Sequence, residues 1–325
     1  MSNPLVSIGL PVVKANYLKD SIESCLIQTH ENIEVIIQNN AKHPNIKTEI
    51  RDLVSQYSDP RIKYFETEEQ LPMVQNWNST LEKAKGEYFS ILCDDDFWEP
   101  TFLEEMMKLS FEFTNSNLFH SRIAIVNEKE KIIKLSSTCP SYEDGIDFIF
   151  HRVDGSRITY LSDFVTKTKA LKELGGFVDF PDGWGSDTFT WFKIALNGGV
   201  AYTSKILFNY RISEINVTNS KRLKFKYLAL DLHYRMLNQI ITNISFGTDR
   251  YSTACKEGLI EKISNYIPEN RKIIFFNLLI KKYKLPIFIT HFFYLIFRIS
   301  IELKNMVLFS TISNLHFKTK NIKKP

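Results

Sequence analysis

The chain has 325 residues, 44% of them hydrophobic, which is enough for one large core or two domains. Its four cysteines form no C-x-x-C pair and its seven histidines form no H-E-x-x-H pattern, so the common zinc motifs and a disulfide framework are excluded. The net charge of +4 is uneven, because residues 271–325 carry 11 Lys and Arg residues against one acid.

The first hundred residues alternate between strand-like and helix-like segments. We expect strands at 5–10, 33–37 and 61–65 and helices at 17–28, 49–57 and 73–84. The largely apolar strand at 33–37 is typical of a parallel sheet covered on both faces. Gly86 has the position of a helix C′ glycine. The alternation predicts an α/β fold with right-handed crossovers.

Further elements follow residue 100. They are a helix at 100–113, a hairpin of strands at 117–127 and 131–135, a strand at 158–166, helices at 169–174 and 187–197, strands near 200–210 and a long helix at 221–245. The stretch 136–160 is expected to be irregular, because one proline and two glycines interrupt it. We expect one domain over residues 1–220 and a helical C-terminal extension over 221–325.

The segment 86–100 carries the strongest chemical signal. An uncharged run ends there in Asp94, Asp95 and Asp96. A buried strand that stops at an acidic turn is typical of the ligand-binding edge of an α/β sheet. Clustered carboxylate oxygens suit Mg²⁺ or Mn²⁺, which commonly also hold a diphosphate. The alternative is a solvated turn in which Asp96 or Glu99 caps the next helix.

Eight short motifs, in order and at matching spacing, resemble the family 2 glycosyltransferases with a GT-A fold. They are residues 6–13, residues 24–37, Asp59–Ile62, Asn76–Asn78, Ala84–Tyr88, the acidic triple with Pro100, Gly175–Phe177 with Asp187, and Tyr210–Arg211. The resemblance covers residues 4–220. It implies a mixed, mostly parallel sheet flanked by helices and a site for a nucleoside-diphosphate sugar.

The resemblance implies roles in donor binding for residues spread over the whole domain. They are Pro11, Val12, Asn39, Arg61, Asp94, Asp95, Trp184 and Arg211. Asn39 stands where the family has an aspartate, and its amide can still pair with a base edge, although uracil loses support. A turn role for Asn39, a core role for Trp184 and a surface role for Arg211 are the structural alternatives.

The same resemblance implies a metal and a catalytic base. Asp96 and Asp95 would hold Mn²⁺ or Mg²⁺, which stabilises a diphosphate leaving group as a Lewis acid. Displacement at an anomeric carbon also needs a group that takes the acceptor's proton. Asp187 matches the family's catalytic aspartate, with Asp179 and Asp182 as alternative bases. Plain capping of the next helix is the structural alternative for Asp187.

The C-terminal tail predicts contact with a membrane surface. Its Lys and Arg residues flank Phe, Ile and Leu side chains, which favours anionic lipid over nucleic acid. Its longest charge-free run, 285–297, is shorter than the roughly 20 apolar residues that a spanning helix needs. A helical hairpin packed on the protein is the alternative. With no room for a signal peptide before residue 5 and with scattered cysteines, we expect a cytoplasmic protein at the inner face of the cell membrane.

These inferences predict an inverting, metal-dependent glycosyltransferase. It would move a sugar to a hydroxyl of a glycan or lipid-linked acceptor in bacterial surface polysaccharide synthesis, such as that of capsule or lipopolysaccharide. A sugar-phosphate nucleotidyltransferase is one alternative, but residues 11–16 lack the glycines of its phosphate loop. A non-catalytic GT-A-like binding protein is the other, with Asn39 as its main support.

Overall fold

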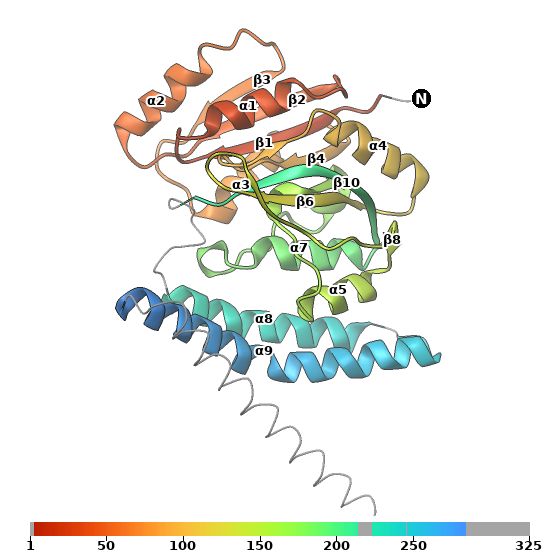
Figure 1. Ribbon diagram of the computed structural model, residues 1–325. Helices are drawn as coiled ribbons and strands as arrows, with labels where there is room; N and C mark the ends of the chain where they lie inside the picture. The colour runs from red at the N-terminus through yellow and green to blue at the C-terminus, as the bar shows by residue number, and fades with distance from the viewer. Residues whose placement is uncertain (1–2, 214–222, 245, 284–325) are drawn as a thin grey trace, which may run out of the picture. The chain divides into compact units, whose positions relative to one another are not determined.

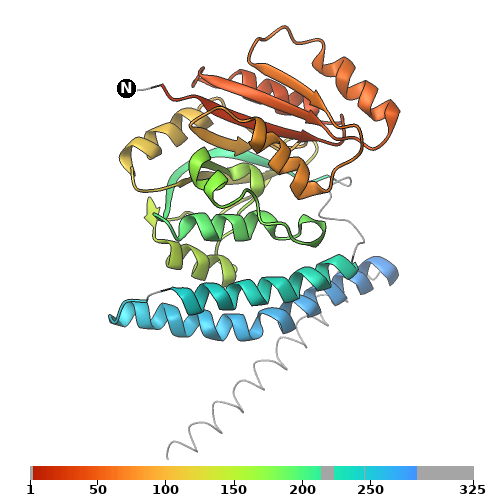
Figure 2. The same ribbon diagram turned by 180° about the vertical axis from the view of Figure 1, so that it is seen from behind.

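The computed structural model describes residues 3–213, 223–244 and 246–283 (Figures 1 and 2). The strands are β1 (Val6–Val12), β2 (Ile33–Asn39), β3 (Ile62–Glu66), β4 (Tyr88–Ile91), β5 (Phe97–Trp98), β6 (Leu118–Val126), β7 (Ile132–Leu135), β8 (Tyr142–Glu143), β9 (Phe164–Lys167) and β10 (Val200–Arg211). They form a sheet of order β3-β2-β1-β4-β9-β6-β10-β5, with β7 beside β6 and β8 beside β10.

Helices cover both faces of this sheet. They are α1 (Leu18–Leu26), α2 (Pro44–Val54), α3 (Met73–Lys83), α4 (Phe102–Glu112), α5 (Gly145–Val153), α6 (Thr168–Glu173), α7 (Ser186–Ala195), α8 (Leu223–Asn243) and α9 (Arg250–Tyr283), with 3₁₀ turns η1 (Leu161–Asp163) and η2 (Pro181–Gly183). One core packs α1, α2 and α4 on the sheet, and a second packs α3, α5 and α7 on the other face. Val35 and Ile36, neighbours in β2, belong to opposite cores, as the period of a strand requires.

Strand direction creates the edge that carries the site. Strands β3, β2, β1, β4, β6 and β10 run one way, while β9 and β5 run the other way. Val12, Asn39 and Glu66, the last residues of β1, β2 and β3, therefore lie in register at one edge. In such sheets, ligands bind beyond the carboxyl ends of the strands.

The predicted mixed, mostly parallel α/β sheet is confirmed, and the differences are local. The stretch 136–160 is only partly irregular, because it contains β8 and α5, and Asp144 caps α5 by accepting hydrogen bonds from the N–H groups of Ile146 and Asp147. Gly86 does not have the left-handed backbone of a helix C′ residue. Instead, a Cβ at Gly86 would lie 2.6 Å from the Leu5 carbonyl oxygen, so the glycine allows two backbones to approach closely.

The compact unit that contains the sheet extends to Ile267, and residues 268–325 form a second unit. The expected boundary after residue 220 falls inside the first unit, because Ala229 and Leu237 of α8 belong to the same core as α5 and α7. Beyond residue 283, the predicted membrane tail lies outside the described residues. Among the helices of the described part, none has both the length and the apolar character needed to cross a bilayer.

Candidate active site

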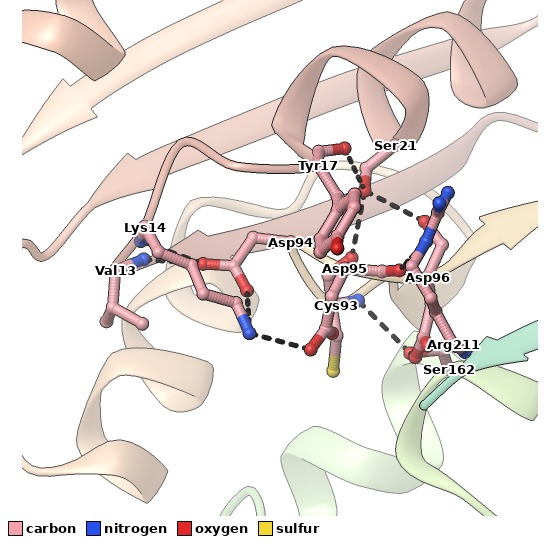
Figure 3. A network of polar contacts seen from close by, with 10 residues as sticks. All are labelled: Val13, Lys14, Tyr17, Ser21, Cys93, Asp94, Asp95, Asp96, Ser162 and Arg211. Carbon is pink, nitrogen blue, oxygen red and sulfur yellow. Dashed lines mark hydrogen bonds and ion pairs between the residues drawn. The ribbon is translucent and has the colours of Figure 1, made fainter. Parts of the chain in front are cut away.

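The acidic turn, residues 93–96, follows β4 at the carboxyl edge of the sheet (Figure 3). Oδ2 of Asp94 accepts hydrogen bonds from the backbone N–H groups of Val13, at 2.8 Å, and Lys14, at 3.0 Å. Both donors belong to the loop that leaves β1. Charge-assisted bonds of this kind are short and strong, so Asp94 joins the ends of β1 and β4.

Asp96 is held from three directions. Its Oδ2 accepts a hydrogen bond from Ser162 Oγ at 3.0 Å, and its Oδ1 accepts one from the Arg211 backbone N–H at 3.1 Å. Ser162 Oγ also accepts from the Cys93 N–H at 3.1 Å, and Ser21 Oγ donates to the Asp96 carbonyl at 2.8 Å. Contacts from α1, η1 and β10 therefore orient the turn.

Lys14 supplies an ammonium group to the acidic turn. Its Nζ lies 2.7 Å from Asp95 Oδ2 and 3.9 Å from Asp94 Oδ1. Burial lowers the pKa of Lys14, but the two carboxylates raise it by more, so the pKa is raised overall. Lys14 is therefore charged at neutral pH.

Burial dominates the pKa shifts of Asp94, Asp96 and Cys93 in the turn. It raises the pKa of Asp94, against the lowering effect of Lys14, and raises the pKa of Asp96, to which the charge of Asp95 adds. Burial also raises the pKa of the Cys93 thiol well above its ordinary value. The turn thus concentrates acidic groups that a cation would stabilise in their charged form.

The donor set fits a hard divalent cation. Candidate ligand atoms of Cys93, Asp95 and Asp96 lie within 4.8 Å of one another. Carboxylate oxygens suit Mg²⁺ and Mn²⁺, whereas a neutral thiol does not. Asp95 and Asp96 are therefore the residues that would hold such an ion, and Cys93 is set aside.

Arg211 braces the acidic turn rather than facing solvent. Its Nε donates to the Asp95 carbonyl at 3.0 Å, and its Nη2 donates to Asp20 Oδ2 at 2.9 Å and to Glu130 Oε1 at 3.4 Å. The guanidinium carbon lies 4.4 Å from the centre of the Tyr17 ring, and the Arg211 residue is 1% exposed. The surface alternative is therefore wrong, and the predicted contact with phosphate gains no support from this geometry.

The fold brings Asp187 to the same edge. Helix α7 ends at Ala195 and β10 starts at Val200, so the chain reverses direction between them. The first turn of α7, with Asp187, consequently lies toward the edge where β1 and β10 end, as Figure 1 shows. The preceding turn η2 is close to α3, since a Cβ at Gly183 would lie 2.7 Å from Met73 Sδ.

Arg152 and Tyr160 connect Asp187 electrostatically with the acidic turn. Burial raises the pKa of Asp187, while the Thr188 N–H and the Arg152 charge lower it. Burial also raises the pKa of Tyr160, on which the charges of both Asp96 and Arg152 act. Arg152 Nη2 is 3.5 Å from Thr188 Oγ1, next to Asp187. Arg152 therefore acts on both Asp187 and Tyr160, and Asp96 acts on Tyr160.

Trp184 lies on α8. Its ring stacks on His233 with 5.3 Å between the ring centres, and its carbonyl is 2.8 Å from His233 Nε2. Burial lowers the pKa of His233 to about 4, so the imidazole is neutral at pH 7 and donates to this carbonyl. Trp184 is only partly buried, and its stacking on a sugar stays a prediction.

Of the two alternative bases, Asp182 has a left-handed φ of 59°, and Asp179 is exposed.

Asn39 is used by the fold. Its Nδ2 donates to the Lys47 carbonyl at 3.0 Å and to the Tyr64 hydroxyl at 2.8 Å, and its Oδ1 accepts from the Ala41 N–H at 3.2 Å. The residue is fully buried. The predicted base contact would require these bonds to break, so the structure favours the turn alternative.

Three further residues, Pro11, Val12 and Arg61, were predicted to contact the nucleotide sugar, and they lie at different edges of the sheet. Pro11 and Val12 are buried in β1 at the edge of the site, where only their backbone can contribute. Arg61 precedes β3, at the opposite edge of the parallel strands, and its Nη2 donates to Asp59 Oδ2 at 2.7 Å and to the Leu26 carbonyl at 3.0 Å. The expected contact of Arg61 with the nucleotide therefore gains no support from this geometry.

Several residues of the site were not predicted. Lys14 follows the expected first strand. A basic residue just after a strand end could have been recognised from the sequence as a candidate for the site. Ser162, Arg152 and Tyr160 lie in or beside the stretch expected to be irregular. No local pattern marks them, because long-range contacts alone bring them to the acidic turn.

Comparison with known proteins agrees with this architecture. Residues 7–168 match the family described as "Glycosyl transferase family 2". "Putative teichuronic acid biosynthesis glycosyltransferase TuaG" of Bacillus subtilis is 26% identical over 67% of this chain and 83% of its own length. An "Uncharacterized glycosyltransferase" of Rickettsia felis is 34% identical over 42% of this chain, but the match spans only 23% of that protein.

Solved structures share the fold. TarS residues 1–349 of S. aureus, in complex with UDP-GlcNAc, superimposes with a TM-score of 0.59 at 16% identity, over 80% of this chain and 72% of that one. The mannosyltransferase PcManGT of Pyrobaculum calidifontis, with GDP-Man and Mn²⁺, gives a TM-score of 0.56 at 14% identity, over 82% and 73%. The predicted GT-A fold is confirmed.

The brace formed by Arg211 predicts a loss of stability. Arg211→Gln should lower the free energy of unfolding by about 2 kcal/mol, because the buried bonds to the Asp95 carbonyl and the stacking on Tyr17 are lost. Asp20→Asn, the control, removes a half-exposed partner and should cost less than about 1 kcal/mol. Chemical denaturation measures both; an unchanged stability of Arg211→Gln would contradict the bracing role.

Proposed function

Because the chain belongs to glycosyltransferase family 2 through residues 7–168, we propose that it transfers a sugar from a nucleoside-diphosphate sugar to an acceptor hydroxyl group. One observation carries the proposal: the acidic turn and the first turn of α7, which contains Asp187, lie at the same edge of the sheet. The donors named in the neighbouring structures, UDP-GlcNAc and GDP-Man, are of this class. The family match also disfavours a nucleotidyltransferase.

The acidic turn is the proposed diphosphate end of the site. A divalent cation held by Asp95 and Asp96 would act as a Lewis acid toward the departing diphosphate. Asp94 keeps the β1 loop against the turn through its two backbone N–H bonds. Ser162 holds the Asp96 carboxylate in one orientation through its hydrogen bond to Oδ2.

Asp187 is the proposed general base of an inverting reaction. The acceptor oxygen forms a bond to the anomeric carbon while the bond from that carbon to the diphosphate breaks. The hydroxyl proton passes to the Asp187 carboxylate, and the bonding electrons leave with the diphosphate. A positioned base of this kind contributes about 10²- to 10⁴-fold to the rate. No covalent sugar–enzyme intermediate is needed.

The proposed acceptor is a glycan or a lipid-linked glycan of a bacterial surface polysaccharide. The name of the TuaG relative supports this process. The basic, aromatic composition of residues 271–325 supports peripheral contact with the inner face of the cell membrane. A cytoplasmic protein with such a tail would meet a carrier lipid at the bilayer surface.

Removal of the base should separate chemistry from binding. Asp187→Asn should lower kcat by about 10²- to 10⁴-fold and leave the affinity for the nucleoside diphosphate within about threefold. Turnover of a panel of UDP- and GDP-sugars, and calorimetric binding of UDP and GDP, measure the two effects. EDTA should abolish turnover of the wild type, and Mn²⁺ or Mg²⁺ should restore it.

Asp179→Asn and Asp182→Asn serve as matched controls for the base. Each removes a nearby carboxylate without changing Asp187, so kcat should stay within about threefold of the wild type. Full turnover by Asp187→Asn would remove Asp187 from the mechanism. A large loss in either control would assign the base to that residue instead.

The charge of Arg152 should be visible in the pH profile. Burial already raises the pKa of Asp187 above its ordinary value of 3.8, and Arg152 partly opposes that rise. A base is active when deprotonated, so kcat/KM falls as pH drops through this pKa. Arg152→Gln should therefore move the acidic limb to higher pH. Lys169→Gln, an exposed charge-matched control, should leave the limb in place, and an unmoved limb in Arg152→Gln would refute the coupling.

Charge in the tail should govern vesicle binding. Glutamine at Lys281, Lys282, Lys284, Arg298 and Lys304 together should weaken binding to phosphatidylglycerol vesicles by at least tenfold, since each base near an anionic surface contributes about 1 kcal/mol. Co-sedimentation measures the bound fraction, with phosphatidylcholine vesicles as the control. Equal binding of the variant and the wild type to phosphatidylglycerol vesicles would contradict the proposed membrane contact.

A further inference from the structure

Lys14 is the cation that the fold itself brings to the acidic turn. Its Nζ is 2.7 Å from Asp95 Oδ2 and 3.9 Å from Asp94 Oδ1, with side-chain exposures of 13% for Lys14, 13% for Asp95 and 7% for Asp94 (Figure 3). The charged groups of Arg211 pair elsewhere, with Asp20 and Glu130. Among the ion pairs of the described residues, Lys14 alone is paired with the carboxylates of the acidic turn.

The position of this ammonium group conflicts with metal binding. Asp95 is one of the two carboxylates that fit a divalent cation, and its Oδ2 is the atom that Lys14 contacts. Two cations at one carboxylate oxygen repel each other strongly in a site shielded from water. A metal ion that binds Asp95 through Oδ2 therefore has to displace the ammonium group.

The displaced ammonium group of Lys14 stays near the acidic turn. The backbone N–H of Lys14 donates to Asp94 Oδ2 at 3.0 Å, which anchors the start of the side chain at the edge of the turn. The flexible four-carbon stem lets the ammonium group move while this anchor holds. It then remains beside the ion, where the phosphate oxygens of a donor would lie.

We propose that Lys14 competes with the divalent cation for Asp95 and, once displaced, binds the diphosphate of the donor. The ammonium group is then exchanged between two anionic partners, a carboxylate and a phosphate. Metal and nucleotide consequently favour each other's binding, because the ion releases the lysine that the diphosphate needs. This inference rests on the proposed function, since it requires a nucleoside-diphosphate donor.

The exchange predicts effects of opposite sign. Lys14→Met removes the competing cation, so affinity for Mn²⁺ alone should rise by about threefold to tenfold. The same variant loses a charge-assisted bond to phosphate, so affinity for UDP or GDP at saturating Mg²⁺ should fall by about tenfold. Electron paramagnetic resonance of free Mn²⁺ measures the first affinity, and isothermal titration calorimetry measures the second.

The controls separate exchange from simple support. Lys14→Gln should repeat both effects, and Lys19→Met, an exposed lysine of α1, should show neither. Circular dichroism and thermal denaturation confirm the fold of each full-length variant. A fall in Mn²⁺ affinity, or an unchanged affinity for the nucleotide, would overturn the exchange and leave the proposed function intact. A wild-type protein that binds no nucleoside diphosphate, with either a purine or a pyrimidine base, would instead refute the proposed function.

Discussion

Three adjacent carboxylates at one edge of the sheet, two of them buried and one partly buried, are the constraint on which the rest of the site depends. Such a concentration of negative charge is unfavourable unless donors and cations surround it. The N–H groups of the β1 loop bind Asp94, Lys14 pairs with Asp95, and Ser162 with the β10 backbone binds Asp96. The partners come from three separate parts of the chain, the β1 loop, η1 and β10, so the neutralised turn exists only in the folded domain.

The partners that stabilise the acidic turn also make it a candidate metal site. A turn held by hydrogen bonds on several sides presents its remaining carboxylate oxygens in a fixed arrangement, which is what metal ligands need. The reversal between α7 and β10 brings Asp187 to that edge, and Arg152 acts on both Asp187 and Tyr160. Diphosphate chemistry and proton transfer are therefore proposed at the same edge of the sheet.

Arg211 and Asn39 show how far residue type can mislead. Both occupy positions where the family resemblance implied contact with the donor, and both have the chemistry for it. The guanidinium of Arg211 instead bonds to the Asp95 carbonyl, and the Asn39 amide bonds to Lys47 and Tyr64. A polar group that is fully buried has to satisfy its hydrogen bonds within the fold first, so its availability to a ligand is decided by its neighbours.

Local patterns in the sequence were sufficient to predict the alternating strands and helices and the acidic turn at a strand end, because each depends on residues close together in the chain. Asp187 was selected by the family resemblance. Tertiary structure decided which carboxylates are paired, that Arg61 lies at the wrong edge, and that Lys14, Ser162 and Arg152 belong to the site. Those contacts join residues far apart in sequence. Their geometry follows from strand order and register, which no single segment encodes.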